Sequence, residues 1–396
     1  MNKGVTYPQG YRAAGVACGL KKDGGLDLAL VVSDVPAQAA GVFTRNVVTG
    51  HSLQVAREHV RGGIAQGVWI NSGCANACVG PDGNADALAV SGVLAEKLGC
   101  PVGHILPAST GVIGQALPVG KVKAGIAAGY AALSCDATTA AQAIMTTDTY
   151  AKEAQTEIMI GGKPVRIGGM AKGSGMIHPN MATLIVTLTT DADAEAYVLR
   201  AALADAVGTT LNRISIDGDT SVCDTTVLLA NGLAGNPSVS KRTPEYDVFV
   251  AGLREVCGQL ARMLAADGEG ATKLLTIHVK NAPTSHDARL IASAIAKSPL
   301  CKTMAFGNDA NWGRIFTAAG YSGAGFNPGK VDIYIGDVKV CEGGSALPFD
   351  EAKAFETLKN KEVVYTLDMN QGTGEDTVWT CDLSYDYVKI NGSYRS

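Results

Sequence analysis

The chain has 396 residues, and at roughly 150 residues per domain this length predicts two or three domains or one large layered α/β unit. Hydrophobic residues make up 46% and charged residues 18%, which excludes a chain too polar to bury a core. The formal net charge is −4 and no block of five like charges occurs, so nucleic acid is not an expected partner.

The first part of the chain is expected to alternate strands and helices. Residues 12–48 hold short apolar runs separated by Gly or Pro, which predicts consecutive antiparallel strands, and 68–71 predicts a further strand. From 84 to 98 the apolar residues recur at helical spacing, and Gly99 is the expected stop. The Ala-rich stretch 119–145 predicts two helices.

The rest of the chain continues this alternation. Expected strands are 154–160, 165–168, 184–188, 274–280, 331–340, 362–369 and 377–382, and expected helices are about 193–207, 244–266 and 284–297. The sequence has no fixed repeat, and no Pro- or Ser-rich linker marks a domain boundary. Clustered strands and helices of this kind predict a layered α/β protein with mixed or antiparallel sheets.

Targeting and cysteine usage predict a cytoplasmic protein without a membrane partner. No apolar run reaches the length of about 18 residues that a membrane span needs, and residues 1–8 lack the apolar core of a secretory signal. The 10 cysteines are dispersed from Cys18 to Cys381. That dispersal is not the pattern of a secreted disulfide framework, so we expect reduced thiols.

The most unusual segment is 171–190, where a Gly-rich stretch runs into a β-rich stretch at Thr183. Ala182 is small, so the Thr183 hydroxyl can attack the Ala182 carbonyl, and water would hydrolyse the resulting ester. The freed α-amine, with an ordinary pKa of about 7.7–8.0, can then act as general base for the same hydroxyl. The alternative is a loop followed by an ordinary Thr-initiated strand, and the residues alone favour that alternative.

A family resemblance reverses this preference. Residues 172–184 resemble the cleavage segment of the ornithine acetyltransferase family, the mono- or bifunctional glutamate N-acetyltransferases of arginine biosynthesis. Similar motifs follow in order over essentially the whole chain, at 40–44, 107–114 (an oxyanion loop), 145–149 (a substrate loop), 212–221, 267–273, 307–315 and 394–395. The resemblance implies an αββα-type layered sandwich with a smaller second α/β region.

The resemblance also implies autocatalytic cleavage into two chains that share this fold. The alpha chain, 1–182, carries the oxyanion, substrate and cleavage loops, and the beta chain, 183–396, begins with the nucleophile. The implied assembly is a heterotetramer of two alpha and two beta chains.

Individual residues match the family's functional positions. Thr183 matches the nucleophile, while Thr110, through its hydroxyl, and Gly111, through a backbone N–H with no Cβ beside it, match the oxyanion hole. The substrate-binding positions are matched by Thr149, Lys172, Thr183, Glu269, Asn391 and Ser396. Of these, Lys172 and Glu269 would supply the countercharges that an α-amino-acid substrate needs.

The implied reaction is ping-pong transfer of acetyl from N2-acetylornithine to glutamate, without a metal or organic cofactor. A bifunctional member would also make N-acetylglutamate from acetyl-CoA and glutamate. Two rivals remain. A β-peptidyl aminopeptidase can share the fold and self-cleavage, although Lys172 and Glu269 favour transfer over hydrolysis, and an uncleaved small-molecule binding protein is the non-enzyme alternative.

The chain departs from the family pattern at two places. Cys74 stands where the family usually has Asn, and Ser396 stands where a final Thr is commoner. Serine keeps the hydroxyl, so substrate binding by Ser396 is still expected.

Overall fold

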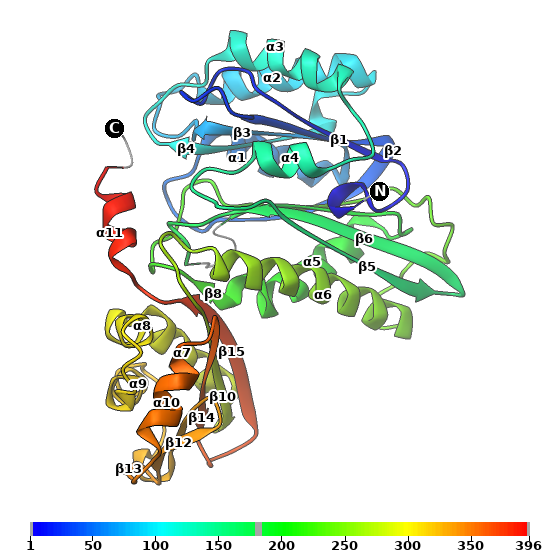
Figure 1. Ribbon diagram of the computed structural model, residues 1–396. Helices are drawn as coiled ribbons and strands as arrows, with labels where there is room; N and C mark the ends of the chain where they lie inside the picture. Colours follow the sequence, from blue (N-terminus) through cyan, green and yellow to red (C-terminus); the bar gives the residue numbers. More distant parts are fainter. Residues whose placement is uncertain (1–2, 179–183, 394–396) are drawn as a thin grey trace. The chain divides into compact units, whose positions relative to one another are not determined.

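The computed structural model describes residues 3–178 and 184–393, which separate into two compact units (Figure 1). The larger unit comprises the described residues within Met1–Gly173, Pro179–Asn212 and Thr220–Leu260. The smaller unit comprises those within Ser174–His178, Arg213–Asp219 and Ala261–Ser396. The predicted alpha and beta chains are defined by cleavage rather than by compactness, and that division stays a prediction.

The larger unit is built on one eight-stranded sheet. Its elements are β1 (Tyr11–Val16), β2 (Leu28–Phe43), α1 (His51–His59), β3 (Ile64–Cys74), α2 (Gly83–Leu98), β4 (Ile105–Val112), α3 (Val119–Ala131), α4 (Thr138–Ala143), β5 (Lys152–Ile160), β6 (Lys163–Lys172), β7 (Ile185–Thr190), α5 (Ala196–Thr209), β9 (Thr225–Ala230) and most of α6 (Pro244–Ala266). Short 3₁₀ turns occur at Gly4–Thr6, Val60–Gly62, Val102–His104 and, at the edge of the smaller unit, Leu211–Arg213. The strand order is β4-β3-β2-β9-β7-β6-β5, with β1 paired to β2.

The long strand β2 folds this sheet into two layers. Its first half pairs with β1 and β3, and its second half pairs with β9. The register with β3 shifts between Val32 and Ala37, and Pro36 lies inside that shift, as expected because proline cannot donate a ladder hydrogen bond. The sequence predicted separate strands here, and the structure corrects them to one interrupted strand.

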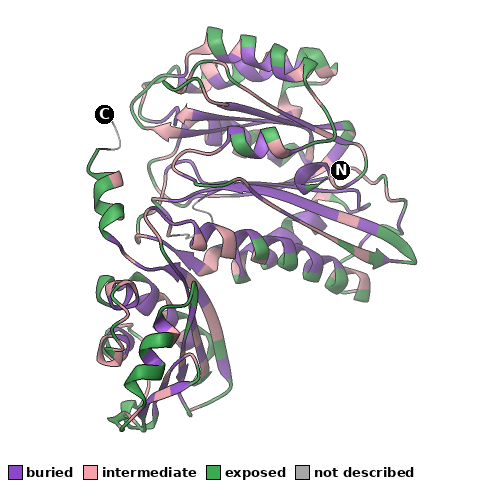
Figure 2. Ribbon diagram, viewed as in Figure 1, coloured by how far each residue is buried: buried purple, intermediate pink, exposed green. Residues whose placement is uncertain are grey.

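Helices cover both outer faces of the folded sheet (Figure 1). The core between the layers contains Ile70 and Leu106 from one layer and Ile185 and Val227 from the other. Helices α2 and α3 pack on the first layer, and α5 and α6 pack on the second. Figure 2 shows that the sheet between them is mostly buried while the helices carry both buried and exposed residues. This α-β-β-α arrangement confirms the predicted sandwich.

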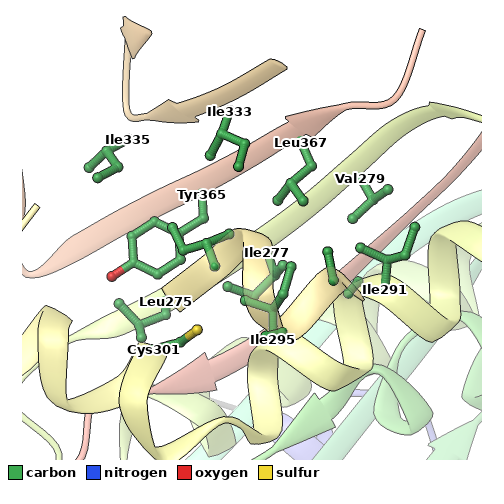
Figure 3. Packing of buried hydrophobic residues seen from close by; sticks show 14 of the residues in the cluster. Leu275, Ile277, Val279, Ile291, Ile295, Cys301, Ile333, Ile335, Tyr365 and Leu367 are labelled. Carbon is green, nitrogen blue, oxygen red and sulfur yellow. The ribbon is translucent and has the colours of Figure 1, made fainter. Parts of the chain in front are cut away.

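The smaller unit is a second α/β region, as predicted. Its elements are β8 (Ile214–Ser215), β10 (Leu274–Ala282), α7 (Ser285–Lys297), α8 (Pro299–Phe306), α9 (Trp312–Gly320), the 3₁₀ turn Pro328–Lys330, β11 (Asp332–Ile335), β12 (Val338–Glu342), β13 (Ser345–Ala346), α10 (Glu351–Leu358), β14 (Glu362–Asp368), β15 (Gly374–Cys381) and α11 (Tyr385–Asn391). The strand order is β13-β12-β11-β14-β10-β15-β8. Figure 3 shows Tyr365, Ile277 and Ile295 packed together in its core.

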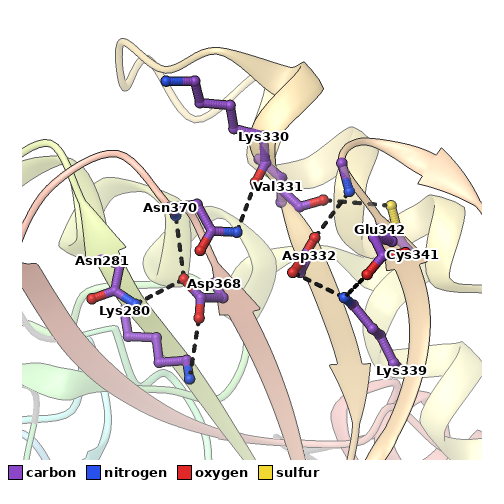
Figure 4. Close-up of polar contacts among 11 residues, drawn as sticks. Lys280, Asn281, Lys330, Val331, Asp332, Lys339, Cys341, Glu342, Asp368 and Asn370 are labelled. Atoms are coloured by element: carbon purple, nitrogen blue, oxygen red, sulfur yellow. Dashed lines mark hydrogen bonds and ion pairs between the residues drawn. The ribbon is translucent and has the colours of Figure 1, made fainter.

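One predicted strand of the smaller unit, 331–340, is a hairpin. Gly336, with φ +60°, turns the chain between β11 and β12 because glycine enters the left-handed region without strain. Polar contacts hold the neighbouring strands: Lys339 Nζ lies 3.1 Å from Asp332, and Lys280 Nζ lies 3.2 Å from Asp368 (Figure 4). These contacts stabilise strand ends, and we assign them no functional role.

Candidate active site

Four strand ends of the larger unit lie in one row. Lys172 at the end of β6 pairs with Ile185 at the start of β7, Ile185 pairs with Thr225 of β9, and Thr225 pairs with Phe43 of β2. The predicted cleavage pair, Ala182 and Thr183, lies outside the described residues. Because β7 begins two residues after Thr183, this row is the part of the described fold closest in sequence to the predicted nucleophile.

Two of the predicted site residues meet at this row. Thr110 comes from β4 in one layer and Lys172 from β6 in the other, both are buried, and Lys172 Nζ donates to Thr110 Oγ1 at 3.4 Å. The predicted oxyanion loop, 107–114, is therefore corrected in part, because its residues through Val112 belong to strand β4. An ammonium group beside a hydroxyl forms an electropositive pair suited to a carboxylate or a developing oxyanion.

Gly111 adjoins this pair in a conformation that favours glycine. Its φ is +123°, and a Cβ placed there would lie 2.5 Å from the carbonyl carbon of Gly73, its partner in the β3–β4 ladder. The sequence predicted glycine here so that a ligand could approach the backbone. The structure gives a second reason, the close approach of β3 itself.

Asp148 organises the loop between the two layers, and the sequence did not single it out. Its carboxylate has no exposed surface and accepts hydrogen bonds from Lys152 Nζ at 2.7 Å, Gly173 N at 2.7 Å and Thr146 N at 3.0 Å. Burial alone would raise the pKa of Asp148, but the ammonium groups of Lys172 and Lys152 outweigh it and lower that pKa to about 2. Asp148 therefore stays ionised and fixes the backbone directly after Lys172.

Thr149, predicted to bind substrate, is the neighbour of Asp148 and is exposed. The ion pair of Asp148 with Lys152 consequently anchors the loop that presents Thr149. The spacing of four residues between the two charges was visible in the sequence. What the sequence does not show is that both side chains are buried.

We expect Asp148→Asn to lower the free energy of unfolding by about 3–5 kcal/mol, because it removes the negative charge that pairs with the buried Lys152 ammonium at 2.7 Å. Urea unfolding measures this change, and kcat/KM should fall as well, since the amide offers one acceptor oxygen to the three donors that the carboxylate accepts from, Lys152 Nζ, Gly173 N and Thr146 N. The matched control is Asp191→Asn, because buried Asp191 also accepts two backbone N–H groups but lies just after the far end of β7. A control that lowered kcat/KM as much as Asp148→Asn would contradict the positioning role.

Asp224 is a second buried carboxyl next to the row. It directly precedes Thr225, and its Oδ2 has no hydrogen-bond partner among the described residues. Burial raises the pKa of Asp224 well above its ordinary value, a shift that Ser221, Lys172 and Thr44 oppose only in part. The signal that could have found Asp224 is its place immediately before a strand.

Cys74, one of the two expected departures from the family pattern, has a buried thiol. Asn71 Nδ2 donates to the Cys74 carbonyl at 2.9 Å. Burial raises the pKa of Cys74, so its side chain stays a neutral thiol. All ten cysteines are free.

The smaller unit joins two other predicted substrate residues. Asn391, the last residue of α11, donates from Nδ2 to Glu269 Oε2 at 2.7 Å, and Glu269 is buried. Glu269 N also donates to Ser174 O at 2.8 Å, and a Cβ on Gly175 would clash with the Glu269 carboxylate. The remaining predicted residue, Ser396, lies outside the described residues.

Asp217 of the smaller unit holds the segment upstream of the predicted cleavage point. Its carboxylate accepts from Met176 N at 2.6 Å and Ile177 N at 2.9 Å. His178 follows, with Nδ1 3.2 Å from Ser215 Oγ, and burial lowers its pKa. Within residues 3–178 and 184–393, no three His, Cys, Asp or Glu residues are grouped to hold a metal ion.

The structure brings buried charged residues together at the strand ends of a layered α/β fold, and comparisons with known proteins specify the family. A family model described as the ArgJ family matches residues 12–396. "Arginine biosynthesis bifunctional protein ArgJ" of Symbiobacterium thermophilum is 50% identical, over 99% of this chain and 98% of that protein. The protein of the same name from Caldanaerobacter subterraneus subsp. tengcongensis is 48% identical, over 99% and 98%.

A solved structure agrees with these relatives. The crystal structure of arginine biosynthesis bifunctional protein argJ from Bacillus halodurans matches with 40% identity and a TM-score of 0.51, over 53% of this chain and 98% of that one. The chain belongs to the ArgJ family. The resemblance found in the sequence is thereby confirmed, as is the prediction of an arginine-biosynthesis enzyme. The roles of individual residues stay predictions.

Proposed function

We propose that the protein transfers an acetyl group from N2-acetylornithine to glutamate, releasing ornithine and N-acetylglutamate. Thr183 accepts the acetyl group between the two half-reactions, after cleavage of the Ala182–Thr183 bond frees its α-amine. The observation that carries the proposal is the buried pair of Thr110 and Lys172 at the strand ends next to β7, in a chain that matches the ArgJ family from residue 12 to 396.

The chemistry follows from these groups. The Thr183 hydroxyl attacks the acetyl carbonyl while the Thr183 α-amine takes its proton, and the carbonyl oxygen develops negative charge. The Thr110 hydroxyl and the Gly111 N–H stabilise that oxyanion. The C–N bond to ornithine then breaks and ornithine leaves with the proton. The amine of glutamate attacks the acetyl-Thr183 ester in the reverse sequence.

Charged side chains select the substrate. Lys172 binds a carboxylate, and Glu269 binds an ammonium group while Asn391 holds the Glu269 carboxylate in place. Thr149 and Ser396 supply further polar contacts. This set recognises an amino acid as second substrate, which favours transfer over the hydrolysis of an aminopeptidase.

The further expectations concern assembly and a second donor. The name "bifunctional" of the relatives supports acetyl-CoA as an additional donor. The Bacillus halodurans chain matches just over half of this chain, and residues 183–396 make up a similar share, which supports cleavage into two chains. The α2β2 heterotetramer stays a prediction. A cytoplasmic location stays a prediction, and no helix in the described part of the chain is long and apolar enough to cross a membrane.

We expect incubation with N2-acetylornithine alone to add one acetyl group to the 183–396 chain, because the first half-reaction ends on a covalent ester. Intact-mass measurement detects the added acetyl, and later addition of glutamate should remove it. The control is glutamate alone, which adds nothing. Acetyl found only on the 1–182 chain would contradict the mechanism, and rapid loss of the acetyl to water without glutamate would favour the aminopeptidase.

A further inference from the structure

The larger unit has an open groove on its surface that the proposed reaction does not use. It is lined by the end of β2, the loop that follows, α1 and α5. Three arginines line it, Arg45, Arg57 and Arg200, together with Phe43 and Thr44.

The three guanidinium groups are not ion-paired within the described part of the chain. None of them forms an ion pair with a carboxylate of residues 3–178 or 184–393, and the neighbouring acid Glu58 is paired with Arg61 instead. Arg57 is held in place, because its guanidinium lies 5.6 Å from the centre of the Phe43 ring and donates to Thr44 O at 3.1 Å. Three positive charges around one groove attract a multiply charged anion, and arginine is the residue best suited to phosphate.

The groove lies close to the candidate active site. Phe43 in its wall pairs with Thr225, which pairs with Ile185 at the start of β7. Adjacent strands are about 4.8 Å apart, so two strand spacings place Phe43 roughly 10 Å from β7. Thr44, which lines the groove, donates from its backbone N–H to Asp224 O at 3.0 Å. Asp224 directly precedes Thr225, so this hydrogen bond joins the wall of the groove to the row of strand ends that includes Lys172.

We propose that this groove binds the phosphate-bearing end of acetyl-CoA. In acetyl-CoA the phosphates and the acetyl group lie at opposite ends of a long molecule. The arginines could therefore bind the phosphates in the groove while the acetyl group reaches the row of strand ends beside it. N2-acetylornithine carries no phosphate and does not use the groove. This inference rests on the proposed function, because acetyl-CoA is there a second donor.

The test compares two charge reversals of equal size. Arg200→Glu lies in the groove, and Lys163→Glu, the matched control, lies at the end of β6 opposite Lys172. Both side chains are exposed and belong to the larger unit. Calorimetry measures the dissociation constant of coenzyme A for the purified protein, with inorganic phosphate as competitor. KM is then measured for each donor.

We expect Arg200→Glu to raise the dissociation constant of coenzyme A and the KM for acetyl-CoA by roughly tenfold or more, the loss of one hydrogen-bonded charged contact. KM for N2-acetylornithine should stay at the wild-type value, and Lys163→Glu should change neither donor. Arg45→Ala should act in the same direction as Arg200→Glu.

Three results would overturn the assignment. They are a wild type that does not bind coenzyme A, an Arg200→Glu variant that binds it as tightly as the wild type, and inorganic phosphate that binds as tightly as coenzyme A. Each of these leaves transfer from N2-acetylornithine to glutamate intact, so the proposed function would survive. Absence of that transfer would instead overturn the proposed function, while the calorimetric affinity for coenzyme A would still decide the groove.

Discussion

Thr183→Ala is expected to leave the protein as one chain of full length and to abolish acetyl transfer. In the proposed mechanism the hydroxyl both attacks the Ala182 carbonyl and later carries the acetyl, so one substitution removes two steps. Intact mass and a denaturing gel distinguish the uncut chain from the fragments 1–182 and 183–396. Activity with N2-acetylornithine and glutamate should fall to background.

Two variants separate the loss of the hydroxyl from general damage to β7. Thr183→Ser keeps a hydroxyl and should still be cleaved. Thr187→Val should be cleaved as the wild type is, because Thr187 is buried in the same strand and its hydroxyl has no hydrogen-bond partner in the described part of the chain. A wild type that stayed full length after prolonged incubation would favour the uncleaved binding protein over the enzyme.

Helical spacing and short apolar runs both predicted elements that the structure contains, among them α2 to α7 and strands such as β5, β10 and β14. The helical spacing in 84–98 matches α2 (Gly83–Leu98), and the expected helix 244–266 matches α6 (Pro244–Ala266). Gly99 ends α2 in the left-handed conformation, with φ 66°, as a glycine stop predicts. A helix of this kind buries one apolar stripe along its surface, and the spacing that forms the stripe can be seen within a short stretch of sequence.

Other elements of the structure were missed. These are β4, β8, β9, β13, α1, α8, α9, α10 and α11. Strand β9 is buried at every position, so it has no alternation to detect. Strand β4 contains Pro107 and Gly111, which suggest a loop, but β4 is an edge strand, and edge strands tolerate both residues.

In the candidate site, too, local motifs predicted some residues and missed others. Motifs pointed to Thr110 and Lys172, and the structure brings them within hydrogen-bonding distance. No local pattern shows that Asp148 faces Lys172, or that Arg57 and Arg200 line one groove, because these proximities depend on how the folded sheet and its helices meet. The pairing of strands that are far apart in the sequence decides which of these residues lie close together, and the sequence alone does not show that pairing.

Thr110→Val is expected to lower kcat by roughly 10²–10³ and to leave KM nearly unchanged. An oxyanion donor acts mainly in the transition state, so its loss affects the chemical step. Glu269→Gln should behave in the opposite way, raising KM for the amino-acid substrates by about tenfold, since under the proposed function Glu269 binds substrate in both the ground and the transition state. Steady-state kinetics on fully cleaved protein measure both constants.

The controls for Thr110→Val use hydroxyls in the same unit. Thr110→Ser keeps a donor and should retain most of kcat. Thr226→Val should leave kcat unchanged, because Thr226 is buried in β9 and its hydroxyl has no hydrogen-bond partner among the residues described. If Thr110→Val raised KM and kept kcat, Thr110 would be a ground-state contact held by Lys172, and its oxyanion role would be wrong while membership of the ArgJ family would still hold.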